Sequence, residues 1–289
     1  MSTIYISDLD GTLLRNNATL SDFSRNTLSE LLHDALPFTV ASARSVVSMR
    51  PMLAGLKLSL PIIEFNGAFI SDLESGQHHI INHIERPIVE DLYQLILTFG
   101  CIPFISSFNG LEDCLYYSDI INQGMQWYLK DRLRANDKRL RSINNLIDSF
   151  HDQIVCLVVI GQANTLASLE DAIKERYANY VETYFYENQY FPDWHWLTIH
   201  HHKASKDQAI RMVLKEFGLQ NSELVVFGDQ NNDIKMFQLA DRAVAVANAS
   251  AELKRYATHV IGSNQEDSVV KFIRDDWKGQ QAIDLPIRL

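Results

Sequence analysis

Residues 4–12 read IYISDLDGT, and this stretch indicates the fold class of the chain. A short apolar run that ends in acidic residues and glycine predicts a buried strand that opens into a loop. Residues two apart on an extended chain point the same way, so Asp8 and Asp10 should bring two carboxylates to one site. Such a pair tolerates ionisation best beside a cation, and its hard oxygens suit Mg²⁺. The alternative is a turn whose acidic residues are incidental.

Strands and helices alternate on the C-terminal side of this stretch. Ser21 is a candidate N-cap for an amphipathic helix, and residues 37–41 and 60–65 read as further strands. The alternation returns after about residue 195, with a helix over 204–217 and strands over 224–227, 243–246 and 260–261. This pattern predicts an α/β fold with a Rossmann-like parallel sheet.

The middle of the chain has a different pattern. Residues 102–106 and 114–118 read as strands joined through Asn109-Gly110, and 154–160 is strongly strand-like. We therefore expect an α+β domain of mainly antiparallel character over 82–193, inserted into a core made of 1–81 and 194–289.

Composition excludes several classes of protein. The 289 residues carry a formal net charge of −10, which argues against nucleic-acid binding because that needs a basic surface. No apolar stretch approaches the ~18 to 20 residues of a membrane span, and the N-terminus lacks the basic start of a signal peptide. Three cysteines without CxxC spacing predict reduced, buried thiols. We expect a soluble cytoplasmic protein with no membrane or nucleic-acid partner.

Polar residues follow four of the predicted strands. In an open parallel sheet, ligands bind beyond the carboxyl ends of the strands, so these residues should gather at one edge. They are Asp8 and Asp10; Ser42; Asn66 and Gly67; and Asp229, Asn232 and Asp233.

Each of these groups also has a plainer interpretation. Asp229 is a candidate ligand for the same metal as Asp8, whereas Asn231 or Asn232 also fits a helix cap. Lys206 begins the 204–217 helix, where it would neutralise a phosphate or hold Asp8, but an ordinary solvated lysine has the same local sequence and Lys203 competes with it. Ser42 fits a phosphate donor or a simple cap equally well.

Together these residues resemble the haloacid dehalogenase superfamily, and within it the Cof-type phosphatases, which carry a large cap inserted between the second and third motifs (class IIB). The matching segments are Asp8-Leu9-Asp10-Gly11-Thr12, Ser42-Ala43-Arg44, Asn66-Gly67-Ala68, Ser205-Lys206, Gly228-Asp229 through Asn232-Asp233, and Asn248-Ala249. Ala43 stands where the family usually has glycine, which concerns the backbone near Ser42 rather than the reaction.

The resemblance implies an Mg²⁺-dependent phosphatase in which Asp8 forms an aspartyl-phosphate and Asp10 is the general acid and base. It assigns the metal to the Asp8 carboxylate, the Asp10 main-chain carbonyl and Asp229, with Asp233 as a further ligand or an orienter of its loop. By the same resemblance Ser42, Lys206 and Asn232 hold the phosphoryl group, and Thr12 steadies Asp10. Gly11, Asn66 and Gly67 support the site.

The substrate should be a small phosphorylated metabolite. Sugar phosphates are the family's usual targets, and pyridoxal phosphate and nucleotides are rivals. A phosphomutase, or a phosphosugar-binding regulator without activity, is the alternative function. The chain should be a monomer or weak homodimer, with the 277–289 tail packed on the core or mediating dimerisation.

The insertion should select the leaving group. Its aromatic residues, including Tyr116, Tyr117 and Trp127, either stack on a ligand or fill the core. A basic stretch over 132–141 either attracts anions or is a solvated helix face. His200, His201 and His202 are adjacent, so on a strand they point to opposite faces and suit no single metal.

Overall fold

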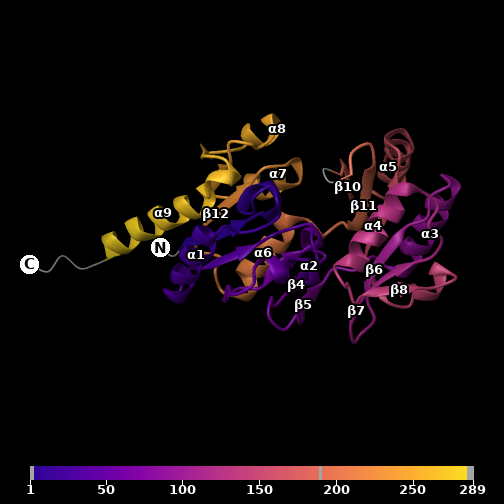
Figure 1. Cartoon of the computed structure of the whole chain (residues 1–289), viewed down its shortest axis with the longest axis horizontal. Helices are drawn as coiled ribbons and strands as arrows, with labels where there is room; N and C mark the ends of the chain where they lie inside the picture. The colour runs from indigo at the N-terminus through magenta and orange to yellow at the C-terminus, as the bar shows by residue number, and fades with distance from the viewer. Residues whose placement is uncertain (1–2, 189–190, 285–289) are drawn as a thin grey trace, which may run out of the picture. The chain divides into compact units, whose positions relative to one another are not determined.

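The computed structural model describes residues 3–188 and 191–284, which form two compact units (Figure 1). The α/β unit consists of Met1–His79 and Ser205–Leu289, and the inserted unit consists of Ile80–Ala204. Of the 277–289 tail, residues 285–289 lie outside the described residues, as does Tyr190.

Five parallel strands form the sheet of the α/β unit, in the order β14-β13-β12-β1-β2. Every residue of β1 is buried, because this inner strand, between β12 and β2, is covered on both faces, as its continuous apolar run predicts. The strands are β1 (Thr3–Ser7), β2 (Phe38–Val40), β12 (Glu223–Gly228), β13 (Arg242–Ala245) and β14 (His259–Val260).

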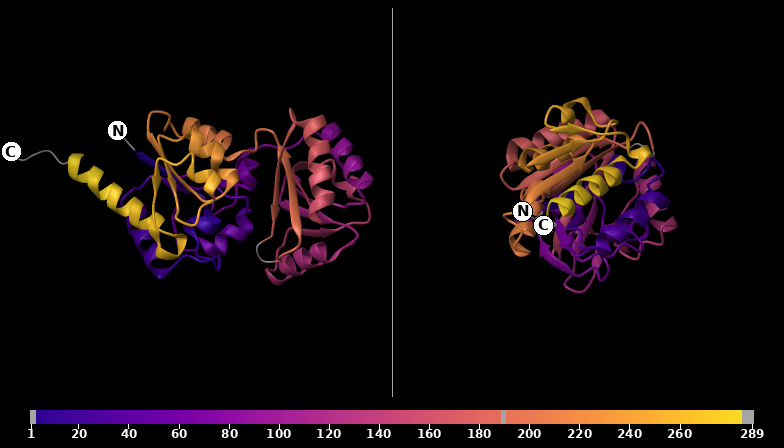
Figure 2. Two further views of the ribbon diagram at one scale, coloured as in Figure 1. Left: turned by 90° about the horizontal axis from the view of Figure 1, so that it is seen from above. Right: turned by 90° about the vertical axis from the view of Figure 1, so that its left-hand side faces the viewer.

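Helices cover both faces of this sheet (Figure 2). Helix α1 packs against α9, and α6 packs against α7. Ser21 caps α1 as expected, because its side chain accepts a hydrogen bond from the Ser24 N–H. The helices of the unit are α1 (Asp22–His33), α2 (Val46–Met52), α6 (Lys206–Glu216), α7 (Ile234–Leu239), α8 (Ala251–Lys254) and α9 (Ser268–Asp284).

The strand expected over residues 60–65 does not extend the parallel sheet. Strand β3 (Ile62–Glu64) pairs antiparallel with β4 (Phe69–Ser71), and β5 (His78–Ile81) completes a separate three-stranded sheet. A single parallel bridge, from Ala41 to Ile63, links β3 to the segment after β2. The chain reverses sharply at Asn66 and Gly67, whose φ angles are 56° and 111°. It therefore returns as β4, antiparallel to β3.

The inserted unit is an α+β layer built on one sheet, with the strand order β10-β11-β9-β6-β7-β8. All neighbouring pairs are antiparallel except β7 and β8. The strands are β6 (Phe104–Phe108), β7 (Asp113–Tyr117), β8 (Leu140–Ser142), β9 (Gln153–Gly161), β10 (Val181–Glu187) and β11 (His195–His201).

Two helices, α3 (Arg86–Thr98) and α5 (Ala163–Tyr177), share one face of this sheet and its apolar core (Figure 2). Helix α4 (Gln123–Arg134) lies on the other face, where Tyr128 contacts Phe104 and Trp196 edge-on. Ile105 belongs to the first face and Phe104 to the second, as the alternation of a strand requires.

The boundary between the units differs from the expected one. We placed the end of the insertion at residue 193, whereas β11 pairs with β9 and β10 and the units divide after Ala204. The histidines stand at both ends of β11 and leave only the short run 196–199 between them, which is a weak strand signal in the sequence.

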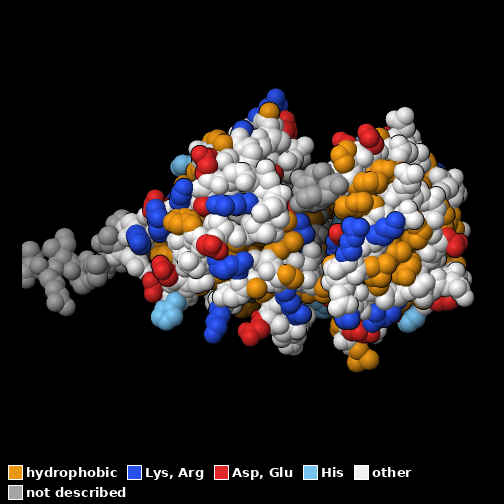
Figure 3. Space-filling view, in the orientation of Figure 1, with side chains coloured by type: hydrophobic (Ala, Val, Ile, Leu, Met, Phe, Trp, Pro, Cys, Tyr) orange, Lys and Arg blue, Asp and Glu red, His pale blue; other side chains and the backbone are white. Residues whose placement is uncertain are grey.

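Two sequence expectations concern the chain as a whole. The three cysteines, Cys101, Cys114 and Cys156, are free and buried, as expected. Among the described residues, no helix has both the length and the apolar character needed to cross a bilayer. On the face that Figure 3 presents, basic and acidic side chains are mixed over each unit.

Candidate active site

The loop after β1 carries the first candidate residue, Asp8. The Asp8 N–H donates to the Phe227 carbonyl at 2.9 Å, which ties this loop to the end of β12. Gly11 has a φ of +74°, and a Cβ atom there would lie 2.3 Å from Oδ2 of Asp229. Position 11 therefore requires glycine, both for its backbone conformation and for the close approach of Asp229.

Lys206 holds the centre of the site. Its Nζ donates to Oδ1 of Asp8 and to Oδ1 of Asp233, both at 2.6 Å, and its side chain is fully buried. Burial by itself would lower the pKa of Lys206, but the charges of Asp233 and Asp8 outweigh burial and raise it above its usual value. The lysine therefore stays charged between two carboxylates, whereas Lys203 is exposed.

Asp233 organises the loop that follows β12. Its Oδ2 accepts the N–H groups of Asp229 at 3.0 Å and Gln230 at 3.1 Å, while its Oδ1 is bound by Lys206. A Cβ atom on Gly228 would lie 2.6 Å from Oδ2 of Asp233, so glycine is needed there as well. Both oxygens of Asp233 are engaged within the protein, which favours the role of loop orienter over that of direct metal ligand.

Thr12 contacts a different acid from the one expected. Its hydroxyl donates to Oδ1 of Asp229 at 3.0 Å, whereas the resemblance assigned it to Asp10. The Gln230 side-chain amide donates to Oδ2 of Asp229 at 3.2 Å. These two bonds orient the Asp229 carboxylate beside Asp8.

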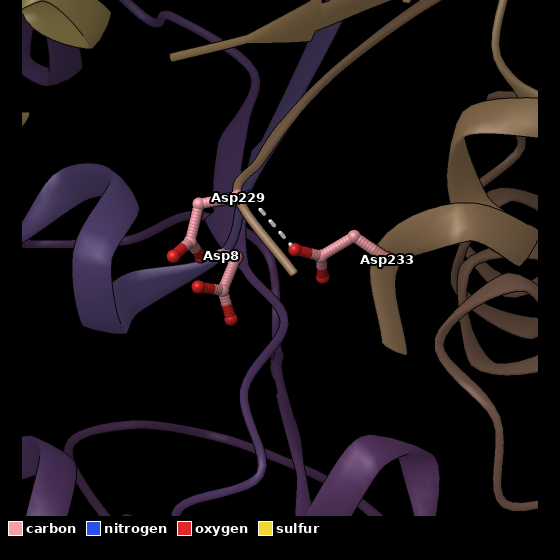
Figure 4. Close-up of side chains that lie close together, drawn as sticks. All are labelled: Asp8, Asp229 and Asp233. Carbon is pink, nitrogen blue, oxygen red and sulfur yellow. Dashed lines mark hydrogen bonds between the residues drawn. The ribbon is translucent and has the colours of Figure 1, made fainter. Parts of the chain in front are cut away.

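Three carboxylates converge at this edge of the sheet. Oxygen atoms of Asp8, Asp229 and Asp233 lie within 4.8 Å of one another (Figure 4). Burial, together with the charges of Asp233 and Asp229, raises the pKa of Asp8 well above its usual value despite Lys206. Burial and the charge of Asp233 raise the pKa of Asp229 to about 6. A hard divalent cation fits this donor set, because it would offset the excess negative charge.

A second group of polar side chains lies at the ends of neighbouring strands. The buried Ser42 accepts the Asn66 N–H at its carbonyl, at 2.9 Å. The Asn232 amide in turn donates to Oδ1 of Asn66 at 3.3 Å. A Cβ atom on Gly67 would lie 2.9 Å from the Ser205 carbonyl, so this turn packs directly on the start of α6. These contacts join Ser42, Asn66 and Asn232 and place Gly67 against α6, although Asn66 and Gly67 follow β3, which lies outside the parallel sheet.

Asp10 is held apart from the three carboxylates. Its two oxygens accept hydrogen bonds from Nε of Arg44 at 2.5 Å and from Nη2 of Arg44 at 2.6 Å. The Asp10 side chain is 30% exposed, so it remains accessible from solvent. The sequence analysis quoted Arg44 in a motif but gave it no role.

Asn248 is a second residue whose role sequence reasoning missed. Its amide donates to the Gly11 carbonyl at 2.7 Å, and its Oδ1 accepts the Asn264 N–H at 3.0 Å. The signal was present, since Asn248-Ala249 matched a family segment, but nothing in the local sequence shows that its partner is 237 residues away.

The other polar groups of the insertion have structural roles. His200 is buried in β11, and burial lowers its pKa to about 4. In the basic stretch, Arg139 is buried in an ion pair with Asp137 and Arg141 pairs with Glu112. Tyr116 donates to Asp152 at 2.9 Å. Among the described residues, Asp8, Asp229 and Asp233 form the one group with metal-ligand spacing, so the three histidines do not form a second.

Comparison with known proteins shows similarity to hydrolases and phosphatases along almost the whole chain. The model of the haloacid dehalogenase-like hydrolase family matches residues 5–273. A 5-amino-6-(5-phospho-D-ribitylamino)uracil phosphatase of Bacillus subtilis is 21% identical, over 93% of this chain and 95% of its own. A putative phosphatase of Haemophilus influenzae is 25% identical, over 94% and 97%. The crystal structure of a haloacid dehalogenase-like hydrolase from Bacteroides thetaiotaomicron has a TM-score of 0.76, with 21% identity over 96% of this chain and 100% of that one.

Proposed function

This chain belongs to the haloacid dehalogenase-like hydrolases and is a phosphatase, and we propose that it hydrolyses a small phosphomonoester with Mg²⁺, using Asp8 as its nucleophile. The observation that carries the proposal is the position of the Asp8 carboxylate. It lies at the end of the inner strand β1, bound to a buried lysine and beside two further buried aspartates. Lys206 neutralises the carboxylate that must approach an anionic phosphate.

The proposed reaction has two steps at Asp8. In the first, an Asp8 oxygen attacks phosphorus, the bond to the ester oxygen breaks, and Asp10 gives its proton to the departing alcohol. In the second, water attacks the phosphorus of the aspartyl-phosphate while Asp10 takes a proton from it. Inorganic phosphate leaves, and the Asp8 carboxylate is restored.

Other residues of the α/β unit hold the phosphoryl group. We propose that Lys206, which binds Asp8, supplies a cation to the phosphoryl oxygens, and that Ser42 and Asn232 supply a hydroxyl and an amide. The Asp8 and Asp229 carboxylates, with the Asp10 main-chain carbonyl, would hold Mg²⁺, and Asp233 would fix the geometry of their loop. The ion supplies positive charge that lets an anionic nucleophile approach phosphate.

The inserted unit is proposed to select the leaving group, and the substrate to be a sugar phosphate or a related phosphometabolite. The name of the Bacillus subtilis relative describes a phosphate ester on a ribityl chain, which is of this class. Release of inorganic phosphate from a panel of phosphorylated metabolites, with Mg²⁺ and with a chelator, tests the substrate class. Transfer of the phosphoryl group within the substrate, without free phosphate, would instead indicate a mutase.

Replacement of Asp8 tests the nucleophile directly. Asp8→Asn should lower the turnover number by about 10³-fold or more, because no carboxylate then attacks phosphorus. Acid-quenched wild-type enzyme should carry covalent phosphate during turnover, and the variant should carry none. Asp34→Asn, at a well exposed aspartate of the same unit, is the matched control and should behave as wild type. Substantial turnover by a folded Asp8→Asn variant would refute the assignment.

A further inference from the structure

The contact between Arg44 and Asp10 has no role in the mechanism above. Two parallel N–H to oxygen bonds, from Nε and Nη2, bind both oxygens of the carboxylate, at 2.5 Å and 2.6 Å. This fork geometry fixes the plane of a carboxylate as well as its position, which a single lysine contact does not. Asp10 is the proposed acid and base, so its orientation bears on both steps of the reaction.

Arg44 is itself held on several sides. Its N–H donates to Oγ of Ser42 at 3.1 Å, and its carbonyl accepts the Phe65 N–H at 3.1 Å. Its Nη1 donates to Oγ of Ser48, in α2, at 3.2 Å. The backbone and the guanidinium are thus anchored independently, so the side chain presents its fork to Asp10 from a fixed base.

The two side chains differ from the carboxylate cluster in exposure. Asp10 is 30% exposed and Arg44 20%, whereas Lys206 is fully buried and Asp8 only 9% exposed. Solvent therefore reaches this pair more readily than it reaches Lys206 or Asp8. Each nitrogen of the guanidinium already has a partner in the protein, which argues against Arg44 as a free anchor for the phosphate.

We propose that Arg44 is a positioning residue for Asp10, which keeps this carboxyl group aimed at the leaving oxygen and then at the attacking water. The inference rests on the proposed function, because it concerns the acid–base step. To exchange a proton, Asp10 gives up one of its two bonds to Arg44, while the other bond keeps the carboxyl group in place. Arg44 thus acts on the reaction only through Asp10.

The test compares two leaving groups in single-turnover experiments that follow formation of the phospho-enzyme. An alkyl phosphate needs a proton on its leaving oxygen, whereas p-nitrophenyl phosphate releases a stable anion without one. The variants are Arg44→Ala, Arg44→Lys, Asp10→Asn and the double variant Asp10→Asn/Arg44→Ala. Arg50→Lys is the matched control, since Arg50 lies within α2 and its Nε donates to the Leu73 carbonyl rather than to a candidate site residue.

A positioning role predicts a selective loss. Arg44→Ala should slow phosphorylation by the alkyl phosphate by about 10²-fold, and by p-nitrophenyl phosphate by less than about threefold. In the double variant, the loss should match that of Asp10→Asn alone within about threefold, because the two residues act as one unit. Arg44→Lys, which keeps the charge but not the fork, should show a smaller loss with the same selectivity. Arg50→Lys should match wild type.

Ser48→Ala provides a graded variant if Arg44→Ala does not fold. It removes one anchor of the guanidinium and should give a loss of about two- to fivefold, again confined to the alkyl phosphate. Equal losses for both substrates, or losses by Arg44→Ala and Asp10→Asn that multiply, would overturn the proposal and indicate that Arg44 binds the phosphate itself. If Asp10→Asn left alkyl-phosphate rates unchanged, the acid–base assignment of Asp10 would fall first, which is a distinct result.

Discussion

Two groups of buried charged side chains, one in each unit, differ in their charge balance. In the inserted unit, Arg139 binds both oxygens of Asp137, at 3.0 Å and 2.7 Å, and the two side chains are 6% and 1% exposed. Burial by itself would raise the pKa of Asp137, but the hydrogen bonds and charge of Arg139 outweigh burial and hold it below its usual value. One cation thus neutralises one anion, and the pair carries no net charge.

In the α/β unit, one ammonium group faces three buried carboxylates. The raised pKa values of Asp8 and Asp229 record the imbalance. The balanced pair needs no further charge, whereas the excess negative charge of the unbalanced cluster is what the proposed Mg²⁺ would offset. The comparison thus separates a structural ion pair from a site built for a ligand.

The largest effect is expected from removing the one cation of the unbalanced cluster. Lys206→Met should lower turnover by about 10³-fold and destabilise the fold by about 3–5 kcal/mol at neutral pH, because it leaves the buried carboxylates of Asp8 and Asp233 without their cation. Steady-state kinetics measures the loss of turnover, and urea unfolding measures the loss of stability. Lys203→Met, at the exposed lysine three residues earlier, is the control and should change neither. A Lys206→Met variant as stable as wild type would contradict the contrast between the balanced pair and the unbalanced cluster.

The balanced pair should affect stability but not the chemistry. Asp137→Asn should destabilise the inserted unit by about 3 kcal/mol, because it leaves the buried Arg139 guanidinium unpaired. Tryptophan fluorescence during unfolding measures this, since Trp127, Trp194 and Trp196 all lie in the inserted unit. The double variant Asp137→Leu/Arg139→Met should recover most of the loss. Arg141→Met, at the partly exposed pair with Glu112, is the control, with an expected loss below about 1 kcal/mol.

The smallest expected effect is a pH-dependent stabilisation by Mg²⁺, which should act on the unbalanced cluster of the α/β unit. The pKa of Asp229 is about 6 in the folded protein against an ordinary 3.8, so its contribution to stability is complete below about pH 4 and is lost as pH rises through about 6. Mg²⁺ should offset that loss, by about 2.7 kcal/mol when its concentration is 100 times Kd. The increase in Tm on adding Mg²⁺ should therefore be larger at about pH 7.5 than at about pH 5. An equal increase in Asp229→Asn would contradict the assignment of the ion to this carboxylate.

Much of the core was predictable because its signals are local. The apolar run before Asp8 and that before Asp229 each end in glycine and acidic residues, and the rule that ligands bind at the carboxyl ends of parallel strands brings them together. The matched family segments then distinguished Lys206 from Lys203. Strand β11 was not predicted, because the histidines at its ends leave only a short apolar run between them.

The contacts between motifs were not predictable in the same way. Thr12 binds Asp229 rather than Asp10, and Asp10 binds Arg44, which is 34 residues away. Which donor meets which carboxylate depends on side-chain directions set by tertiary packing, and no spacing within one motif encodes them. Likewise, the positive φ angles at Asn66 and Gly67 were not predicted. They reverse the chain, so that β3 pairs antiparallel with β4.

The position of β1 between β2 and β12 has a consequence for how the molecule is made. Its residue Tyr5 pairs with Phe38 on one side, but with Val225 on the other, a partner synthesised 220 residues later. The inserted unit is continuous in sequence, so all its strands can pair before β12 exists. Long-range pairings form slowly, and domains fold as units during synthesis. Asp8, the proposed nucleophile, is therefore synthesised before the inserted unit, whereas Lys206, Asp229 and Asp233 are synthesised after it.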